Sequence, residues 1–154
     1  MEKTNVMRLL EQKKIPYTVH TYEADASKTG EEIAELLQED ADRVFKTLVA
    51  QGKSAAYYVF VIPVNAELDL KKAASASGEK SVSMIKQKEL LPLTGYVHGG
   101  CSPIGMKKQF TTFFHETVSG YERIYFSAGK VGYQVEVSPE DISKIIRYGM
   151  ADLV

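Results

Sequence analysis

Residues 44–64 read VFKTLVAQGKSAAYYVFVIPV. The runs 44–50 and 55–64 are rich in β-branched and aromatic residues, which favour strands. The four residues between them, Gln51-Gly52-Lys53-Ser54, have the length and composition of a hairpin turn. We therefore predict a pair of adjacent strands at the centre of a sheet.

Helices and further strands are predicted on both sides of this hairpin. The additional strands are expected over 17–22, 96–98, 110–118, 124–127 and 133–137. Helices are expected over 69–77 and 83–91, and three others are expected to begin at Thr4 or Asn5, at Thr29 and at Ser138. These elements do not alternate regularly enough for a doubly wound sheet. The predicted class is α+β, with a mixed, largely antiparallel sheet or partial barrel flanked by helices.

Local signals define the ends and the inward faces of these helices. Thr29 and Glu32 have the spacing of a capping box, and Gly149 is placed to end the last helix. The apolar residues expected to face inward are Val6, Leu9 and Leu10 in the first helix, and Ile33, Leu36 and Leu37 in the second.

The composition is that of an ordinary globular protein. The chain has 154 residues, the length of one domain, with 44% hydrophobic and 25% charged residues. No window approaches the roughly 20 apolar residues of a membrane span, and residues 1–5 carry no secretory signal pattern. The single cysteine cannot form an internal disulfide. These features predict one domain, no membrane association and a cytoplasmic location.

Positive charge is concentrated in one part of the chain, although the net charge is −1. Residues 43–130 contain 12 basic and 6 acidic residues, whereas the remainder contains 7 basic and 14 acidic residues. Lysines 71, 72, 86, 88, 107 and 108 are either a solvated surface or contacts for RNA phosphates.

Lys46 is the first candidate for chemistry. Alternation places Val44, Lys46 and Leu48 on one face of the strand, and Phe45 and Thr47 on the other. A charge in such an apolar strand either protects a sheet edge from aggregation or serves a binding site.

A second candidate element is the loop His98-Gly99-Gly100-Cys101-Ser102-Pro103-Ile104-Gly105. Its glycines let the backbone approach a ligand closely, and its N–H groups suit a carbonyl, carboxylate or phosphate oxygen. We expect the loop to connect two strands. A third element, Ser127-Ala128-Gly129-Lys130-Val131-Gly132, places another lysine between glycines at the end of a strand.

In their order and spacing, these three elements resemble the YbaK/EbsC family of aminoacyl-tRNA editing domains, and within it the bacterial Cys-tRNA(Pro) deacylases. The resemblance covers nearly the whole chain. It implies that Lys46 lies in the substrate pocket and is needed for activity. It also implies substrate contacts from the following residues: Tyr22, Thr47, Gly99, Gly100, Ser102, Pro103, Gly105, Ser127, Gly129 and Lys130.

The resemblance further implies a mechanism without a metal or cofactor. No carboxylate pair or Ser-His-Asp set stands out as an acid–base apparatus. In the family, the thiol of the attached cysteine is thought to attack its own ester. Cys101 is a weaker candidate as a nucleophile, with His98 or His115 as its base, because it occupies a variable position of the family loop. The three histidines are too few and too irregularly spaced for a zinc site.

The expected function is removal of cysteine from mischarged Cys-tRNA(Pro), near prolyl-tRNA synthetase. Val131 replaces a second basic residue of the family, and Thr29 stands where a relative has an aromatic residue, so fine specificity stays open. The alternatives are a deacylase for alanyl or another small aminoacyl group, and a tRNA-binding module without turnover.

Overall fold

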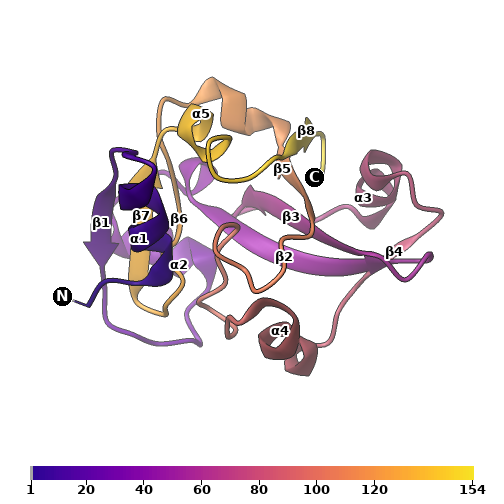
Figure 1. The fold of residues 1–154 in the computed structure, drawn as a ribbon, viewed down its shortest axis with the longest axis horizontal. Coiled ribbons are helices and arrows are strands. Elements are labelled where there is room, and N and C mark those ends of the chain that lie inside the picture. The colour runs from indigo at the N-terminus through magenta and orange to yellow at the C-terminus, as the bar shows by residue number, and fades with distance from the viewer. Residues whose placement is uncertain (1) are drawn as a thin grey trace.

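The hairpin at 44–64 forms the centre of the larger of two sheets (Figure 1). The structure is a computed structural model and describes residues 2–154. Strands β2 (Phe45–Gly52) and β3 (Tyr57–Pro63) are antiparallel, with Lys46 opposite Ile62. The sheet is completed by β4 (Val82–Met84), β5 (Thr111–His115) and β8 (Gly149–Ala151) in the order β4-β2-β3-β5-β8. β3, β5 and β8 run parallel to one another, so the sheet is mixed.

The smaller sheet is wholly antiparallel, with the order β1-β7-β6. It contains β1 (Thr18–Thr21), β6 (Ile124–Ser127) and β7 (Tyr133–Val137). An isolated bridge between Val44 and Tyr125 links it to the start of β2. The strands therefore form two joined sheets, and the predicted α+β class with mostly antiparallel pairing is confirmed.

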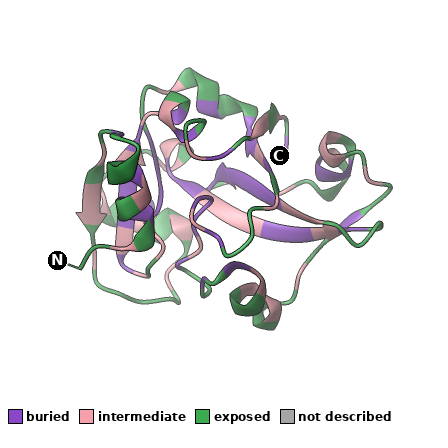
Figure 2. Ribbon diagram, viewed as in Figure 1, coloured by how far each residue is buried: buried purple, intermediate pink, exposed green. Residues whose placement is uncertain are grey.

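The alternation of β2 and β3 places the two larger clusters of buried residues on opposite faces of these strands. Buried residues are coloured purple in Figure 2. Phe45, Val49 and Val61 face a core shared with α1 (Asn5–Gln12) and the smaller sheet. Phe60 and Ile62 face a second core with α3 (Leu70–Ser77).

Three of the predicted helix starts are confirmed by their caps. Thr4 accepts a hydrogen bond from the N–H of Met7 in α1, and Asp69 caps α3. The capping box of Thr29 and Glu32 opens α2 (Gly30–Leu36). The other helices are α4 (Gln87–Thr94), α5 (Pro139–Ile142) and the 3₁₀ turns η1 (Ala41–Arg43) and η2 (Glu116–Gly120).

Several expected elements differ in the structure. Residues 96–98 are loop, so the glycine-rich loop connects α4 to β5 and does not connect two strands. The helix expected over 83–91 starts at Gln87, because 82–84 pair with β2, and it continues through Pro92. The last helix stops at Ile142, well before Gly149, which begins β8. The inward faces expected for the first two helices also differ. Leu36 is 50% exposed and Leu9 is only partly buried, whereas Met7 and Ala34 are buried.

Candidate functional site

A cleft of about 460 Å³ opens where the start of β2 meets the smaller sheet. Its walls are formed by α2 and the loop before it, β2, α4 and the loop after it, and the adjacent strands β6 and β7. Gly30 holds the α2 wall close to β3, since a Cβ at this position would lie 2.5 Å from the Cβ of Val64. The polar or functional side chains lining the cleft are Ser27, Lys28, Thr29, Glu31, Lys46, Thr47, His98, Cys101, Ser127 and Gln134.

Lys46 and Thr47 come from adjacent positions on β2. Lys46 is partly buried, and within residues 2–154 it makes no ion pair. The Thr47 hydroxyl is buried without a hydrogen-bond partner among the described residues. Because buried polar groups are normally paired, this cleft has hydrogen-bonding capacity that the protein itself does not use.

The glycine-rich loop lies directly against the turn after β6. A Cβ on Gly100 would lie 3.1 Å from the backbone nitrogen of Val131, and a Cβ on Gly99 would lie 3.4 Å from the Cα of Ala26. Gly99 lines the cleft, whereas Gly100 is buried behind it. The second and third sequence elements are thus brought together in the fold.

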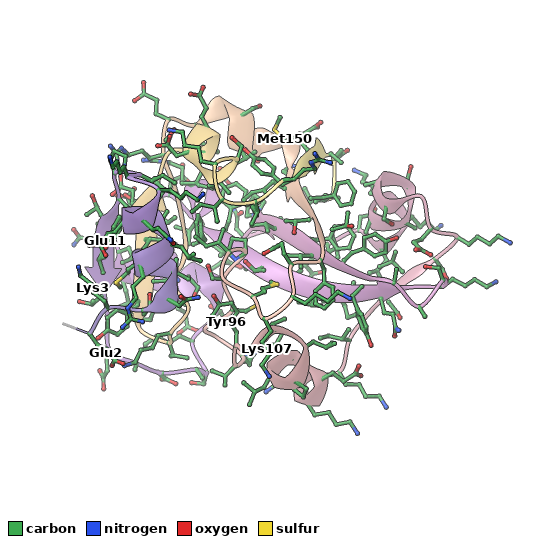
Figure 3. All side chains as sticks on the ribbon, viewed as in Figure 1. Glu2, Lys3, Glu11, Tyr96, Lys107 and Met150 are labelled. Carbon is green, nitrogen blue, oxygen red and sulfur yellow. The ribbon has the colours of Figure 1, made fainter. Side chains whose placement is uncertain are left out.

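Other residues of the predicted set support the loop and do not line the cleft. Cβ atoms at Gly105 and Gly129 would lie 2.7 Å and 3.0 Å from side-chain atoms of Tyr96, which is labelled in Figure 3. The Tyr96 hydroxyl donates a hydrogen bond to the carbonyl of Ile104 at 2.6 Å. Tyr96 therefore fills the space that both glycines leave.

Ser102 and Pro103 are buried in the same loop. The Ser102 hydroxyl has no partner among the described residues, and the Pro103 carbonyl accepts a hydrogen bond from the Gln109 amide at 3.3 Å. Neither residue lines the cleft.

Tyr22 and Lys130 also lie outside the cleft lining. The Tyr22 hydroxyl is buried and unpaired among the described residues, and its backbone N–H donates to the carbonyl of Gly132 at 2.9 Å. The Lys130 ammonium lies 2.7 Å from the Glu2 carboxylate and 5.3 Å from the ring centre of Tyr133. A substrate contact by Lys130 would require it to leave Glu2.

Gln134 is a cleft residue that the sequence analysis did not identify. It lies opposite Ser127 in the β6–β7 pairing, is only 5% exposed, and its Oε1 atom has no partner among the described residues. The sequence signal is weak, because a glutamine within an alternating strand normally faces solvent. Gln134 lines the cleft because this face of β7 is covered by other parts of the fold.

Cys101 and the histidines do not form an activated thiolate–imidazole pair. Burial raises the pKa of the Cys101 thiol to about 12, so the reactive thiolate is disfavoured. His115 is buried elsewhere, where its Nδ1 accepts a hydrogen bond from the N–H of Leu153 at 3.1 Å. His20 contacts the Glu136 carboxylate at 3.0 Å. His98 is exposed at the cleft wall.

Residues 2–154 contain no group of three or more His, Cys, Asp or Glu side chains arranged to hold a metal ion. They also contain no helix long and apolar enough to cross a membrane.

Residues 24–145 match the family described as the aminoacyl-tRNA editing domain. This match covers most of the chain and includes every residue that lines the cleft. The chain belongs to the aminoacyl-tRNA editing domain family.

Two sequence relatives and one solved structure are similar to the chain. It is 46% identical to EbsC of Enterococcus faecalis (strain ATCC 700802 / V583), a proposed Cys-tRNA(Pro)/Cys-tRNA(Cys) deacylase, over 99% of this chain and 93% of EbsC. It is 32% identical to part of the proline–tRNA ligase of Shouchella clausii (strain KSM-K16), over 73% of this chain and 20% of the ligase. A crystal structure described as a proposed trans-editing enzyme for prolyl tRNA synthetase has the same fold. Its TM-score is 0.81, with 21% identity over 99% of this chain and 98% of the other.

Proposed function

We propose that this editing domain is a deacylase that removes cysteine from mischarged Cys-tRNA(Pro), acting in trans on the released aminoacyl-tRNA. The observation that carries the proposal is the 46% identity to EbsC over nearly the full length of both chains. A cleft lined by an unpaired lysine and an unpaired buried hydroxyl supports it.

The cleft offers an electrostatic role for Lys46. A partly buried ammonium without an anionic partner is well suited to an oxygen that gains negative charge during the reaction. At the ester carbonyl, such a charge stabilises the transition state more than the ground state. At the adjacent phosphate, whose charge does not change during the reaction, it would hold the substrate in place. Thr47, Ser127 and Gln134 then provide hydrogen bonds that position the polar part of the aminoacyl group.

The proposed chemistry uses the substrate's own thiol. The cysteine sulfur attacks the ester carbonyl, a C–S bond forms, and the C–O bond to the terminal ribose breaks. The thiol proton ends on the ribose hydroxyl of the released tRNA, and water then opens the four-membered thiolactone. Alignment of reacting groups in one molecule lowers such barriers by as much as about 7 to 11 kcal/mol in the best intramolecular models. The raised pKa of Cys101 agrees with a reaction that does not depend on a protein thiolate.

Size exclusion is the proposed basis of selectivity. A confined cleft rejects a larger side chain by steric clash, but it discriminates poorly against a smaller one. Alanyl-tRNA is therefore the natural competitor. The resemblance of part of a proline–tRNA ligase to this chain supports action beside prolyl-tRNA synthetase, in the cytoplasm where that synthetase works.

The test is incubation of the purified protein with Cys-tRNA(Pro), Ala-tRNA(Pro) and Pro-tRNA(Pro), with loss of the aminoacyl ester followed over time. Lys46→Ala serves as the parallel variant. We expect rapid loss of cysteine alone, and only with Lys46 present. Preferential loss of alanine would show that Ala-tRNA(Pro), and not Cys-tRNA(Pro), is the substrate. Binding of tRNA with no turnover of any ester would show that the protein is a binding module and not a deacylase.

A further inference from the structure

We propose that the tRNA leaves the cleft over α4, with its phosphates held by Lys86, Lys88, Lys107 and Lys108. This group is called the α4 lysine surface below. The inference rests on the proposed function, because it takes the aminoacylated end of a tRNA as the occupant of the cleft. It adds the direction of the RNA and the residues that contact it.

The α4 lysine surface borders the cleft. Lys86 immediately precedes α4, and Leu90, in the first turn of that helix, lines the cleft. At the other end of α4, the N–H of Lys107 donates to the carbonyl of Thr94 at 2.9 Å, which holds Lys107 beside the helix (Figure 3). Both ends of α4 thus present positive charge next to a cleft wall.

The charges of this surface are free to bind a polyanion. All four lysines are exposed, and within residues 2–154 none of them forms an ion pair. Other lysines are already neutralised: Lys72 lies 2.8 Å from Asp152, and Lys130 lies 2.7 Å from Glu2. An unpaired ammonium can replace the counterions of a phosphate without first losing a protein partner.

The opposite side of the cleft carries Lys28 in its lining, but the neighbouring surface of α2 is acidic. A neighbouring shallow groove is lined by Glu31, Glu32, Glu35 and Glu39 of α2 and its C-terminal flank. Phosphates that crossed α2 would meet these carboxylates, and like charges brought together are unfavourable. Lys71 and Lys72 belong to α3, which lies well away from α4 (Figure 1). The α4 side is therefore the basic exit that adjoins the cleft.

Apolar side chains accompany these lysines. Leu91 and Val97 are each 51% exposed, one within α4 and the other just after it. Exposed apolar groups beside unpaired charges suit a nucleotide, which presents a base face next to a phosphate. A phosphate ion alone would need only the lysines.

The experiment compares two quadruple variants with equal loss of charge. K86A/K88A/K107A/K108A removes the α4 lysine surface, whereas K13A/K53A/K71A/K80A removes four exposed lysines elsewhere. Binding of uncharged tRNA(Pro) is measured across a series of salt concentrations. We expect the first variant to bind at least about 10-fold more weakly and with a reduced salt dependence, since each phosphate contact contributes about 0.7 to 0.9 to the logarithmic slope. The second variant should bind nearly as tightly as the unmodified protein. Equal losses in both variants, or no loss in the first, would overturn the proposal.

A phosphate-free substrate separates this inference from the proposed function. The cysteinyl ester of adenosine fills the cleft but does not reach the α4 lysine surface. The α4 quadruple variant should cleave it at the unmodified rate while it loses rate on Cys-tRNA(Pro) at low concentration. Failure of the unmodified protein on both substrates would reject the proposed function itself.

Acetylation of the unmodified protein gives a readout that needs no variant. Bound tRNA should protect Lys86, Lys88, Lys107 and Lys108 from acetylation, measured by mass spectrometry of the digested protein. Lys13, Lys53, Lys71 and Lys80 should react equally with and without tRNA. Protection of the second set in place of the first would contradict the proposed exit.

Discussion

Ser127 and Gln134 face each other across β6 and β7, and both line the cleft that contains Lys46. Ser127 belongs to the elements that carry the family resemblance, whereas Gln134 became a candidate only through its place in the fold. The Gln134 side chain combines burial with an unpaired oxygen, an arrangement that costs stability unless a ligand completes it.

The first prediction concerns Gln134→Leu. Deacylation should fall about 10- to 100-fold, because a buried hydrogen bond to the substrate is lost. The melting temperature should stay the same or rise, since leucine replaces an unsatisfied polar group of similar size. Gln87→Leu, on exposed α4 surface, is the control. A large drop in both activity and melting temperature would instead assign Gln134 a structural role.

Lys46→Met is expected to remove deacylation almost completely. Loss of one preorganised charge at a developing oxyanion typically costs about 100- to 1,000-fold in rate. Because Lys46 has no ion pair within residues 2–154, chemical denaturation should show little change in the free energy of unfolding. Lys53→Met in the hairpin turn controls for the change in net charge. An unfolded Lys46→Met protein would point to a structural lysine.

Cys101→Ala should remain active in deacylation. Burial raises the pKa of the Cys101 thiol to about 12, so iodoacetamide should alkylate the folded protein about 100- to 1,000-fold more slowly than the unfolded chain at pH 8. The neutral thiol contributes stability fully below pH 9, the ordinary value. That contribution falls as the pH rises towards 12, because the unfolded chain loses its proton first. A folded but inactive Cys101→Ala protein would restore the nucleophile hypothesis.

Tyr96→Phe should destabilise the glycine-rich loop. The substitution removes the 2.6 Å hydrogen bond to the Ile104 carbonyl in a buried environment, and this costs about 1 to 2 kcal/mol. The free energy of unfolding in urea measures it. Tyr121→Phe is the matched control, because the Tyr121 hydroxyl makes no hydrogen bond within the described chain. Equal stability of the two variants would show that the Tyr96 bond does not support the loop.

Glu79→Gln should alter the pH dependence of stability. The Glu79 carboxylate accepts hydrogen bonds from the N–H and hydroxyl of Ser54 and from the Tyr58 hydroxyl, and these lower its pKa below the ordinary 4.5. The resulting stability is present above pH 4.5 and is lost as the pH falls through the lowered value. Thermal melts should therefore separate the two proteins at pH 7, and the separation should shrink as the pH falls below 4.5. A separation that is constant with pH would contradict this account.

Much of the architecture follows from short-range sequence patterns. The hairpin at 44–64, the caps at Thr4 and Asp69, and the capping box at Thr29 and Glu32 were all predicted and are all present. Their signals act over a few residues, through alternation and through side chains that satisfy nearby backbone N–H groups. The same reasoning failed at 96–98 and at Gly149, where pairing with distant strands and packing of the loop override local preference.

The sequence by itself determined the class of fold, the central hairpin and the three elements that carry the family resemblance. Tertiary structure alone decided which polar groups share the cleft and which lysines stay free. Gln134 becomes a candidate site residue because the face of β7 that carries it is covered, whereas Lys130 is paired with Glu2, 128 positions away. Burial and charge pairing depend on segments that meet only after folding, so no local pattern in the chain encodes them.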